Sequence, residues 1–163
     1  MERVEFQFTT EFDLEFCYQQ FYVYDRTLFP ETIDLTPDHL RQGFARLESF
    51  VVFRALQQEG TAHATLILSN QGHLPPLENF ERIISVPVEI VSGELAIDGP
   101  ASDGSFIYPI PPGHYNAIVA QKSTDDDTED ISIIMLKANT PLQYSSILLA
   151  DPKLDPPDKL IEL

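Results

Sequence analysis

Apolar and polar residues alternate with a period of two through most of this chain, a pattern typical of half-buried β-strands. The alternation predicts strands over 14–24, 50–56, 63–69, 82–92, 94–98, 106–110, 115–122 and 131–137. Turn-forming glycines and prolines separate these segments at short intervals. Because turns this frequent favour antiparallel strands in packed sheets, we expect a mostly β fold, an antiparallel β-sandwich of about eight strands.

Three local features add detail to this pattern. The alternation shifts by one residue at Gln19 and Gln20, which predicts a β-bulge within the first strand. Pro87 lacks the amide hydrogen that a central strand donates, so it indicates an edge position or a bulge. Cys17 lies in the first strand with no neighbouring cation, which favours a buried, unreactive thiol.

One short helix is predicted near residues 37–46. Residues 36–38, Thr-Pro-Asp, supply an N-cap, a proline at the first helical position and an acid at the positive end of the helix. Leu40 and Phe44 are four residues apart and would share a face against a sheet. Gly43 is a poor helix former, so we expect two or three turns at most.

The chain is expected to form a single β-sandwich domain over residues 1–140, followed by a proline-rich acidic arm over 141–163. Its 163 residues are enough for one hydrophobic core. Prolines stand among charged residues in the last segment, which is typical of an extended arm or a frayed end. Residues 144–150 have the composition of one further short strand.

The charge of the chain is strongly negative. It carries 26 acidic and 10 basic residues, a formal net charge of -16. This charge argues against direct binding of nucleic acid, which needs clustered cations, and against anionic membranes. A basic protein partner is compatible with it, and acidity that only maintains solubility is the alternative. With no basic, apolar leader and no long apolar run, we expect a cytoplasmic protein.

The densest acidic cluster lies in a loop between two predicted strands. It consists of Asp125, Asp126, Asp127, Glu129 and Asp130. Closely spaced carboxylates can ligate calcium, but this run has neither the alternating spacing nor the glycine of a calcium-binding hand. We therefore expect a solvated hairpin tip or a surface that recognises a basic partner, and no metal ligand is assigned.

Nothing in the chain points to catalysis. The sequence contains no zinc-protease, nucleophile-elbow or phosphate-loop motif and no cluster of cysteine with histidine. The four histidines have no ligand-like spacing: His39, His63, His73 and His114. We predict that the protein is not an enzyme, and we assign no catalytic residue and no cofactor.

Several short motifs nevertheless occur in a characteristic order. They are Tyr-Gln-Gln-Phe-Tyr-Val-Tyr at 18–24, Asp-Leu-Thr at 34–36, Gln-Gly-Phe-Ala-Arg at 42–46, Val-Val-Phe at 51–53, Val-Pro-Val at 86–88 and Pro-Gly-His-Tyr at 112–115. In order and spacing the chain resembles the competence protein J family, inhibitors of the DNA-entry nuclease of naturally transformable bacteria. The resemblance extends over roughly residues 15–137. Leu35 stands where the family tends to carry tryptophan.

The resemblance implies a non-enzymatic inhibitor of a non-specific nuclease. Such a nuclease holds a polyanion, so its cleft presents cations, and carboxylates of an inhibitor can compete with phosphates. The acidic cluster is one candidate contact. The other is the segment 30–46, with Phe29 as an aromatic anchor if it proves exposed. The polar candidates of this segment are Asp34, Asp38, Arg41 and Arg46.

A different class of function stays open beside the inhibitor. A sandwich that binds a ligand, or calcium at the acidic cluster, would need no nuclease partner. Calcium-dependent thermal stabilisation would favour that class, because a ligand held only by the folded state raises its stability. The oligomeric state does not follow from either reading.

Overall fold

The computed structural model describes residues 7–69, 77–100, 104–141 and 143–161. In this part of the chain one helix, α1 (Pro37–Gln42), accompanies eleven strands. The strands are β1 (Gln7–Phe16), β2 (Gln20–Asp25), β3 (Phe44–Leu47), β4 (Phe50–Arg54), β5 (Gly60–Ser69), β6 (Arg82–Ile90), β7 (Glu94–Asp98), β8 (Phe106–Pro109), β9 (Gly113–Asp125), β10 (Thr128–Ala138) and β11 (Ser146–Leu149).

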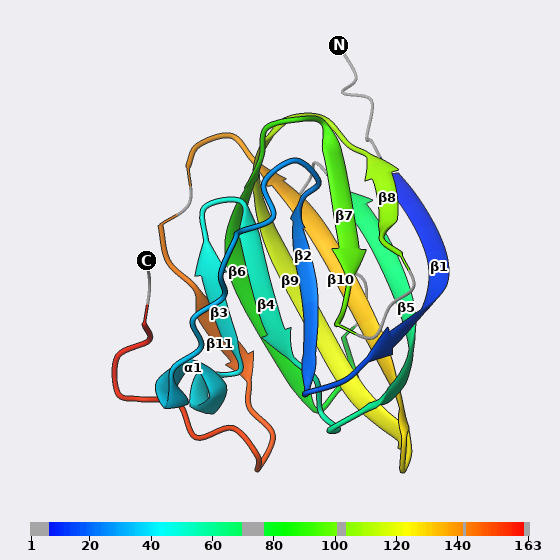
Figure 1. Cartoon of the computed structure of the whole chain (residues 1–163), viewed down its shortest axis with the longest axis vertical. Helices are drawn as coiled ribbons and strands as arrows, with labels where there is room; N and C mark the ends of the chain where they lie inside the picture. Colours follow the sequence, from blue (N-terminus) through cyan, green and yellow to red (C-terminus); the bar gives the residue numbers. More distant parts are fainter. Residues whose placement is uncertain (1–6, 70–76, 101–103, 142, 162–163) are drawn as a thin grey trace.

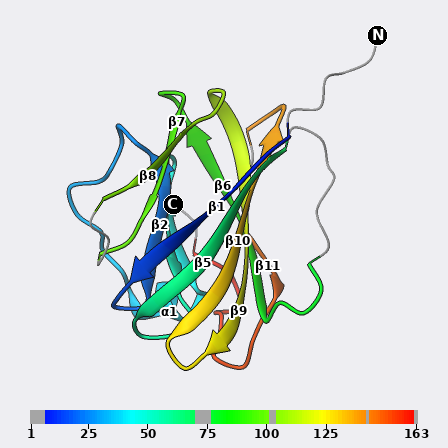
Figure 2. The same cartoon turned by 90° about the vertical axis from the view of Figure 1, so that its right-hand side faces the viewer.

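The strands form two sheets that face each other (Figure 1, Figure 2). One sheet has the order β1-β5-β10-β9-β6-β11, and the other has the order β3-β4-β2-β7-β8. Neighbouring strands are antiparallel except β5 and β10, which run parallel. The expected mostly β, sandwich-like fold with one short helix is confirmed, with more strands than the eight expected.

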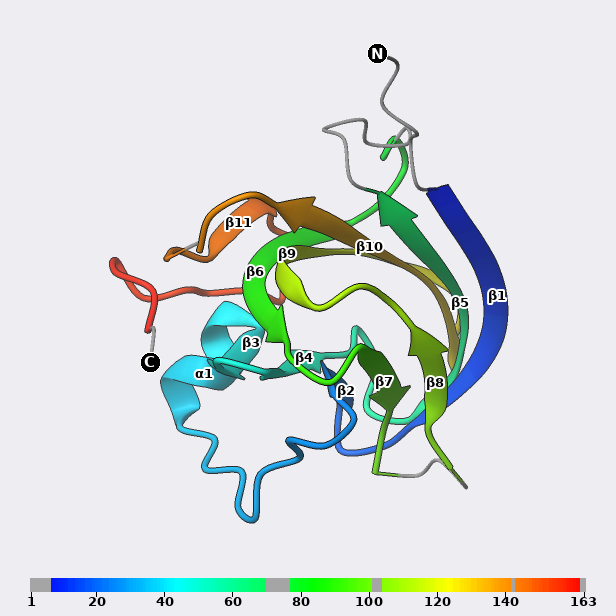
Figure 3. The same cartoon turned by 90° about the horizontal axis from the view of Figure 1, so that it is seen from above.

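The hydrophobic core fills the space between the sheets. On β5 the inward side chains are Ala62, Ala64, Leu66 and Leu68, all buried in one cluster with residues of both sheets. Phe21 and Phe53 of the smaller sheet stack with ring centroids 5.5 Å apart. Seen from above, the larger sheet curves around the smaller one (Figure 3). The apolar positions of the period-two pattern therefore face a single core that lies between the two sheets.

The predicted strand over 14–24 is in fact two strands in different sheets. Tyr18 and Gln19 both adopt the left-handed backbone conformation, with φ of 55° and 56°. Gln20 then donates its backbone N–H to the carbonyl of Cys17 at 3.1 Å, which closes a tight turn from β1 to β2. The expected bulge is wrong, because the shift in alternation marks the change of sheet. Cys17 in this turn is partly exposed rather than buried.

The start of α1 follows the cap chemistry expected from the sequence. Thr36 is the N-cap, its hydroxyl accepts a hydrogen bond from the backbone N–H of His39, and Pro37 is the first helical residue. The ring Nδ1 of His39 in turn accepts from the backbone N–H of Thr36 at 3.1 Å. This reciprocal pair satisfies amide groups that a helix leaves unpaired at its first turn.

The helix ends earlier than the predicted residue 46. Gly43 takes a left-handed conformation with φ of 88°, and a Cβ there would lie 2.9 Å from side-chain carbons of Ile84 and Leu154. The chain leaves the helix at this point, so Phe44 begins β3 instead of extending α1. Leu40 is exposed, and the expected shared face of Leu40 and Phe44 is wrong.

Residues 143–161 lie on the sandwich. Strand β11 pairs with β6 at the edge of the larger sheet, and the side chain of Leu154 is part of the core. The fully buried Arg82 donates from Nε to Asp151 Oδ1 at 2.6 Å and from Nη2 to Asp151 Oδ2 at 3.2 Å. A bidentate ion pair therefore joins this segment to β6. The division of the chain at residue 140 stays a prediction.

Pro87 lies in a part of β6 that, among the described strands, pairs with a neighbouring strand on one side only. Strand β11 pairs with β6 at Ser85, Ile84 and Ile83 and does not reach Pro87. On the other side Pro87 lies opposite Asn116 of β9 in an unbroken register. Strand β6 is therefore not the edge strand of the sheet, but at Pro87 one of its sides has no partner strand in the described part of the chain, which suits proline without a bulge.

Candidate functional site

Asp125 is the last residue of β9, and Asp126 and Asp127 form the turn to β10; we call these three residues the acidic tip. All three side chains are exposed, and the tip is the lower right end of the molecule in Figure 1. The side-chain amide of Gln57 donates to the carbonyl of Asp125 at 2.5 Å, and the N–H of Thr61 donates to the carbonyl of Asp127 at 3.1 Å. The carboxylates are therefore presented by a backbone that the neighbouring loop holds in place.

Gly60 is required for this arrangement. Its φ is 151°, and a Cβ at this position would collide with the backbone carbonyl of Asp127. We expect Gly60→Ala to lower the free energy of unfolding by about 1–3 kcal/mol, because backbone atoms of the tip must move. Urea denaturation measures this effect. Gly104 is the matched control, since a Cβ there meets nothing within 4 Å; an equal loss in Gly104→Ala would contradict the explanation.

The structure corrects the assignment of Glu129 to the exposed acidic surface. This residue lies on β10 and is 1% exposed. Its Oε2 accepts from the backbone N–H of Leu56 at 3.1 Å, and its Oε1 accepts from Gln121 Nε2 at 3.4 Å. Glu129 points into the core side of β10, since the side chains of a strand alternate between its two faces. It is not available to a partner in this structure.

Burial raises the pKa of Glu129 to about 7, against the opposing effect of its hydrogen bonds and of Arg82. A carboxyl group whose folded pKa is raised stabilises the fold below its unfolded pKa, near 4.5, and loses this contribution as the pH rises through about 7. We expect Glu129→Gln to be more stable than the parent by about 1–2 kcal/mol at pH 8 and to vary less between pH 5 and pH 8. Urea denaturation across this range checks it; a parallel fall in both proteins would contradict it.

Asp130 lies on the outer face of the larger sheet, next to carboxylates that the sequence analysis did not select. Its Oδ2 is 3.9 Å from Lys122 Nζ. Across β5 it aligns with His63 and Asp13, and His63 Nδ1 is 3.5 Å from Asp13 Oδ1. The exposed carboxylates of β1 are Glu11, Asp13 and Glu15. Their spacing of two residues could have predicted this shared acidic face from the sequence, because alternate residues of a strand lie on the same face.

The structure divides the polar candidates of the second segment, 30–46, between α1, which carries Asp38 and Arg41, and the surface beside β3, where Asp34 and Arg46 lie. Asp38 and Arg41 form an ion pair at 2.9 Å on α1, and Arg41 also reaches Asp155 at 3.5 Å. Arg46 on β3 donates to the carbonyl of Gln143 at 3.1 Å. Asp34, by contrast, makes no hydrogen bond or ion pair with any residue in the described part of the chain. In Figure 1 α1 is at the lower left, so this segment is apart from the acidic tip.

Phe29 is exposed enough to act as an anchor. Its side chain is 47% exposed, and its ring packs edge-on against Tyr22, Tyr24 and Phe50 at centroid distances of 5.7, 5.1 and 5.3 Å. These aromatic residues lie on the outer face of the smaller sheet. Aromatic side chains held in this way are common at the centres of protein interfaces, so the anchoring role stays a prediction with its condition met.

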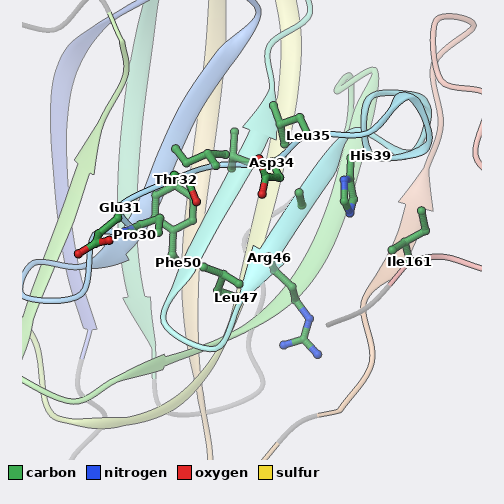
Figure 4. Close-up of a pocket in the computed structure, with 13 residues that line it drawn as sticks. Pro30, Glu31, Thr32, Asp34, Leu35, His39, Arg46, Leu47, Phe50 and Ile161 are labelled. Carbon is green, nitrogen blue, oxygen red and sulfur yellow. The ribbon is translucent and has the colours of Figure 1, made fainter.

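A pocket of about 520 Å³ opens beside these aromatic residues, which we call the β3 pocket (Figure 4). It lies between residues 30–35, which cross the outer face of the smaller sheet, and the strands β3 and β4. The lining residues are Pro30, Glu31, Thr32, Ile33, Asp34, Leu35, His39, Ala45, Arg46, Leu47, Phe50, Val52 and Ile161. Sequence reasoning missed it, because β3 was assigned to the helix.

Within the described ranges, no group of three or more histidine, cysteine or acidic side chains is placed to hold a metal ion. His73 lies outside the described residues. The calcium-binding alternative stays a prediction, for which melting with and without calcium is the check. The described part of the chain contains no helix with the length and apolar character needed to cross a membrane.

Two solved structures share this fold. The crystal structure of ComJ from Bacillus subtilis, inhibitor of the DNA degrading activity of NucA, has a TM-score of 0.64 and 19% identity and covers 82% of this chain and 100% of that chain. The protein of crocagin biosynthetic gene J has a TM-score of 0.57 and 15% identity and covers 78% of this chain and 97% of that chain. At these identities the similarity concerns the fold alone. No curated protein sequence matches the chain.

The family model described as Competence protein J (ComJ) matches residues 13–155. The match begins in β1, includes α1 and the acidic tip, and ends beyond the buried ion pair of Arg82 with Asp151. It therefore covers both sheets and confirms the resemblance inferred from the short motifs. The chain belongs to the competence protein J family.

Proposed function

We propose that this protein is a non-enzymatic inhibitor that binds a non-specific nuclease of the DNA-entry type. The observation that carries the proposal is the acidic tip, where Asp125, Asp126 and Asp127 are exposed on a fixed backbone. Family membership supports the class of function, since ComJ of Bacillus subtilis is an inhibitor of the DNA degrading activity of NucA. The proposal includes a basic partner surface and a cytoplasmic location.

The mechanism that we propose is competition with the phosphates of DNA. A nuclease cleft binds a polymer with about one negative charge per 1.7 Å of duplex axis, so its cations are spaced for closely placed anions. The three carboxylates of the acidic tip imitate a short stretch of this polymer. The carboxylates on β1 and the net charge of -16 add a long-range field that accelerates encounter with a basic cleft.

The acidic tip is too small to form the whole interface. Stable protein interfaces bury about 800 Å² on each partner and derive most of their affinity from a few aromatic and arginine contacts. We propose that the segment 30–46 and Phe29 provide the second contact. Of the two acidic candidates in this segment, Asp38 is paired with Arg41, whereas the carboxylate of Asp34 has no partner among the described residues.

The test is titration of a metal-dependent, non-specific endonuclease from the same cell with this protein, at low and high salt. Excess divalent metal excludes chelation, and labelled DNA alone excludes binding of the substrate by the protein. We expect stoichiometric inhibition that weakens as salt increases, because exposed charges are screened. No inhibition at any ratio would reject the proposed function. Inhibition that does not respond to salt would reject the electrostatic contact.

A further inference from the structure

The β3 pocket combines an apolar floor with the carboxylate of Asp34. Its floor is formed by Phe50 and Val52 of β4 and Ala45 of β3, and Ile33 and Leu35 cover one side. A volume of about 520 Å³ lies in the range of pockets that bind small ligands or large side chains. The pocket is therefore suited to a mainly apolar group of some length.

Asp34 determines the charge that such a group must carry. Figure 4 shows its carboxylate directed into the pocket, whereas Glu31 points outward at the far side. Two other polar side chains of the lining are engaged elsewhere: Arg46 donates to the carbonyls of Pro87 and Gln143, and the ring Nδ1 of His39 accepts the backbone N–H of Thr36 at the start of α1. An occupant without positive charge would remove Asp34 from water with no compensating partner.

We propose that the β3 pocket binds an arginine side chain of the nuclease partner. Its methylene stem would lie against Phe50 and Ile33, and its guanidinium would donate to the carboxylate of Asp34. Arginine fits better than lysine, because its planar head is weakly hydrated and can donate two parallel hydrogen bonds to one carboxylate. Its stem also covers apolar surface. The inference rests on the proposed function, in that the occupant belongs to a basic nuclease.

The test uses a peptide probe, so that it does not depend on inhibition. The probe is acetyl-Leu-Arg-Leu-amide, and its control contains citrulline, which replaces the guanidinium by a neutral urea of the same shape. Both are titrated into the 15N-labelled protein. We expect the arginine peptide to shift amide signals around the pocket and the citrulline peptide to bind about fivefold more weakly. Asp34→Asn should abolish this difference.

Asp126→Asn is the matched control, since it removes the same charge from the acidic tip. It should leave the difference between the two peptides at the pocket unchanged. Equal binding of both peptides, shifts confined to the acidic tip, an unaltered difference in Asp34→Asn or no binding at all would each overturn the inference.

The nuclease assay separates this inference from the proposed function. If the parent protein inhibits the nuclease and Asp34→Asn raises the half-inhibitory concentration about fivefold, the pocket contributes to the complex. Inhibition that Asp34→Asn leaves unchanged would overturn the inference and retain the function. If the parent does not inhibit, the proposed function fails, and with it the assignment of the arginine to a nuclease.

Discussion

Replacing Asp151 by asparagine should lower the free energy of unfolding by about 3 kcal/mol. Arg82 is fully buried, and Asp151 supplies both acceptors of its bidentate ion pair. Asparagine leaves a buried guanidinium without its hydrogen-bonded counter-charge, and breaking a buried pair by removing one partner is strongly destabilising. Urea denaturation at pH 7 measures the loss.

Asp155→Asn is the control for this experiment. Asp155 is an exposed carboxylate four residues further on, paired with Arg41 at 3.5 Å. Such a surface pair contributes little, so we expect a change within about 0.5 kcal/mol. An equal effect of the two variants would contradict the special role of Asp151.

The effect of this substitution depends on pH, because Asp151 ionises in the parent protein and the asparagine of the variant does not. Burial by itself would raise the pKa of Asp151, but the hydrogen bonds and the charge of Arg82 lower it overall. A carboxyl group with a lowered folded pKa stabilises the fold above its unfolded pKa, near 3.8, and this contribution disappears as the pH falls through the folded pKa. We expect the difference between parent and Asp151→Asn to be full at pH 7 and to shrink in acid.

The second large effect is expected on association with the nuclease. The triple substitution Asp125→Asn, Asp126→Asn and Asp127→Asn should slow association about tenfold at low salt and make it less dependent on salt. Asparagine has nearly the same shape and retains the side-chain oxygen with which Asp125 accepts the N–H of Asp126. Stopped-flow measurement of binding across a salt series gives both quantities.

A triple substitution elsewhere on the surface is the control for net charge. Glu48→Gln, Glu78→Gln and Glu89→Gln together remove three carboxylates outside the acidic tip. If the acidic tip is the contact, this control should slow association far less than the triple substitution in the tip. Equal slowing would assign the effect to overall charge and reject the tip as the contact.

The sequence by itself determined the local elements. The strand predicted over 94–98 has the bounds of β7, and the residues at 36–38 mark the start of α1. The alternation of side chains and the capping of a helix depend only on residues that are neighbours in sequence. Strands and helix starts can therefore be predicted before the tertiary structure is known. The short motifs were sufficient to indicate the family, and the run Asp125, Asp126 and Asp127 was recognised as a hairpin tip.

The tertiary structure alone decided which of these features meet. Glu129 belongs to the acidic run in sequence, but its place on β10 opposite Leu56 buries it. The β3 pocket combines residues 30–35 with β3, β4 and Ile161. Asp151 forms an ion pair with Arg82, although 69 residues of sequence separate them. Burial and such distant contacts depend on how the sheets pack, and the physical reason is that local periodicity carries no information on which distant segment will cover a side chain.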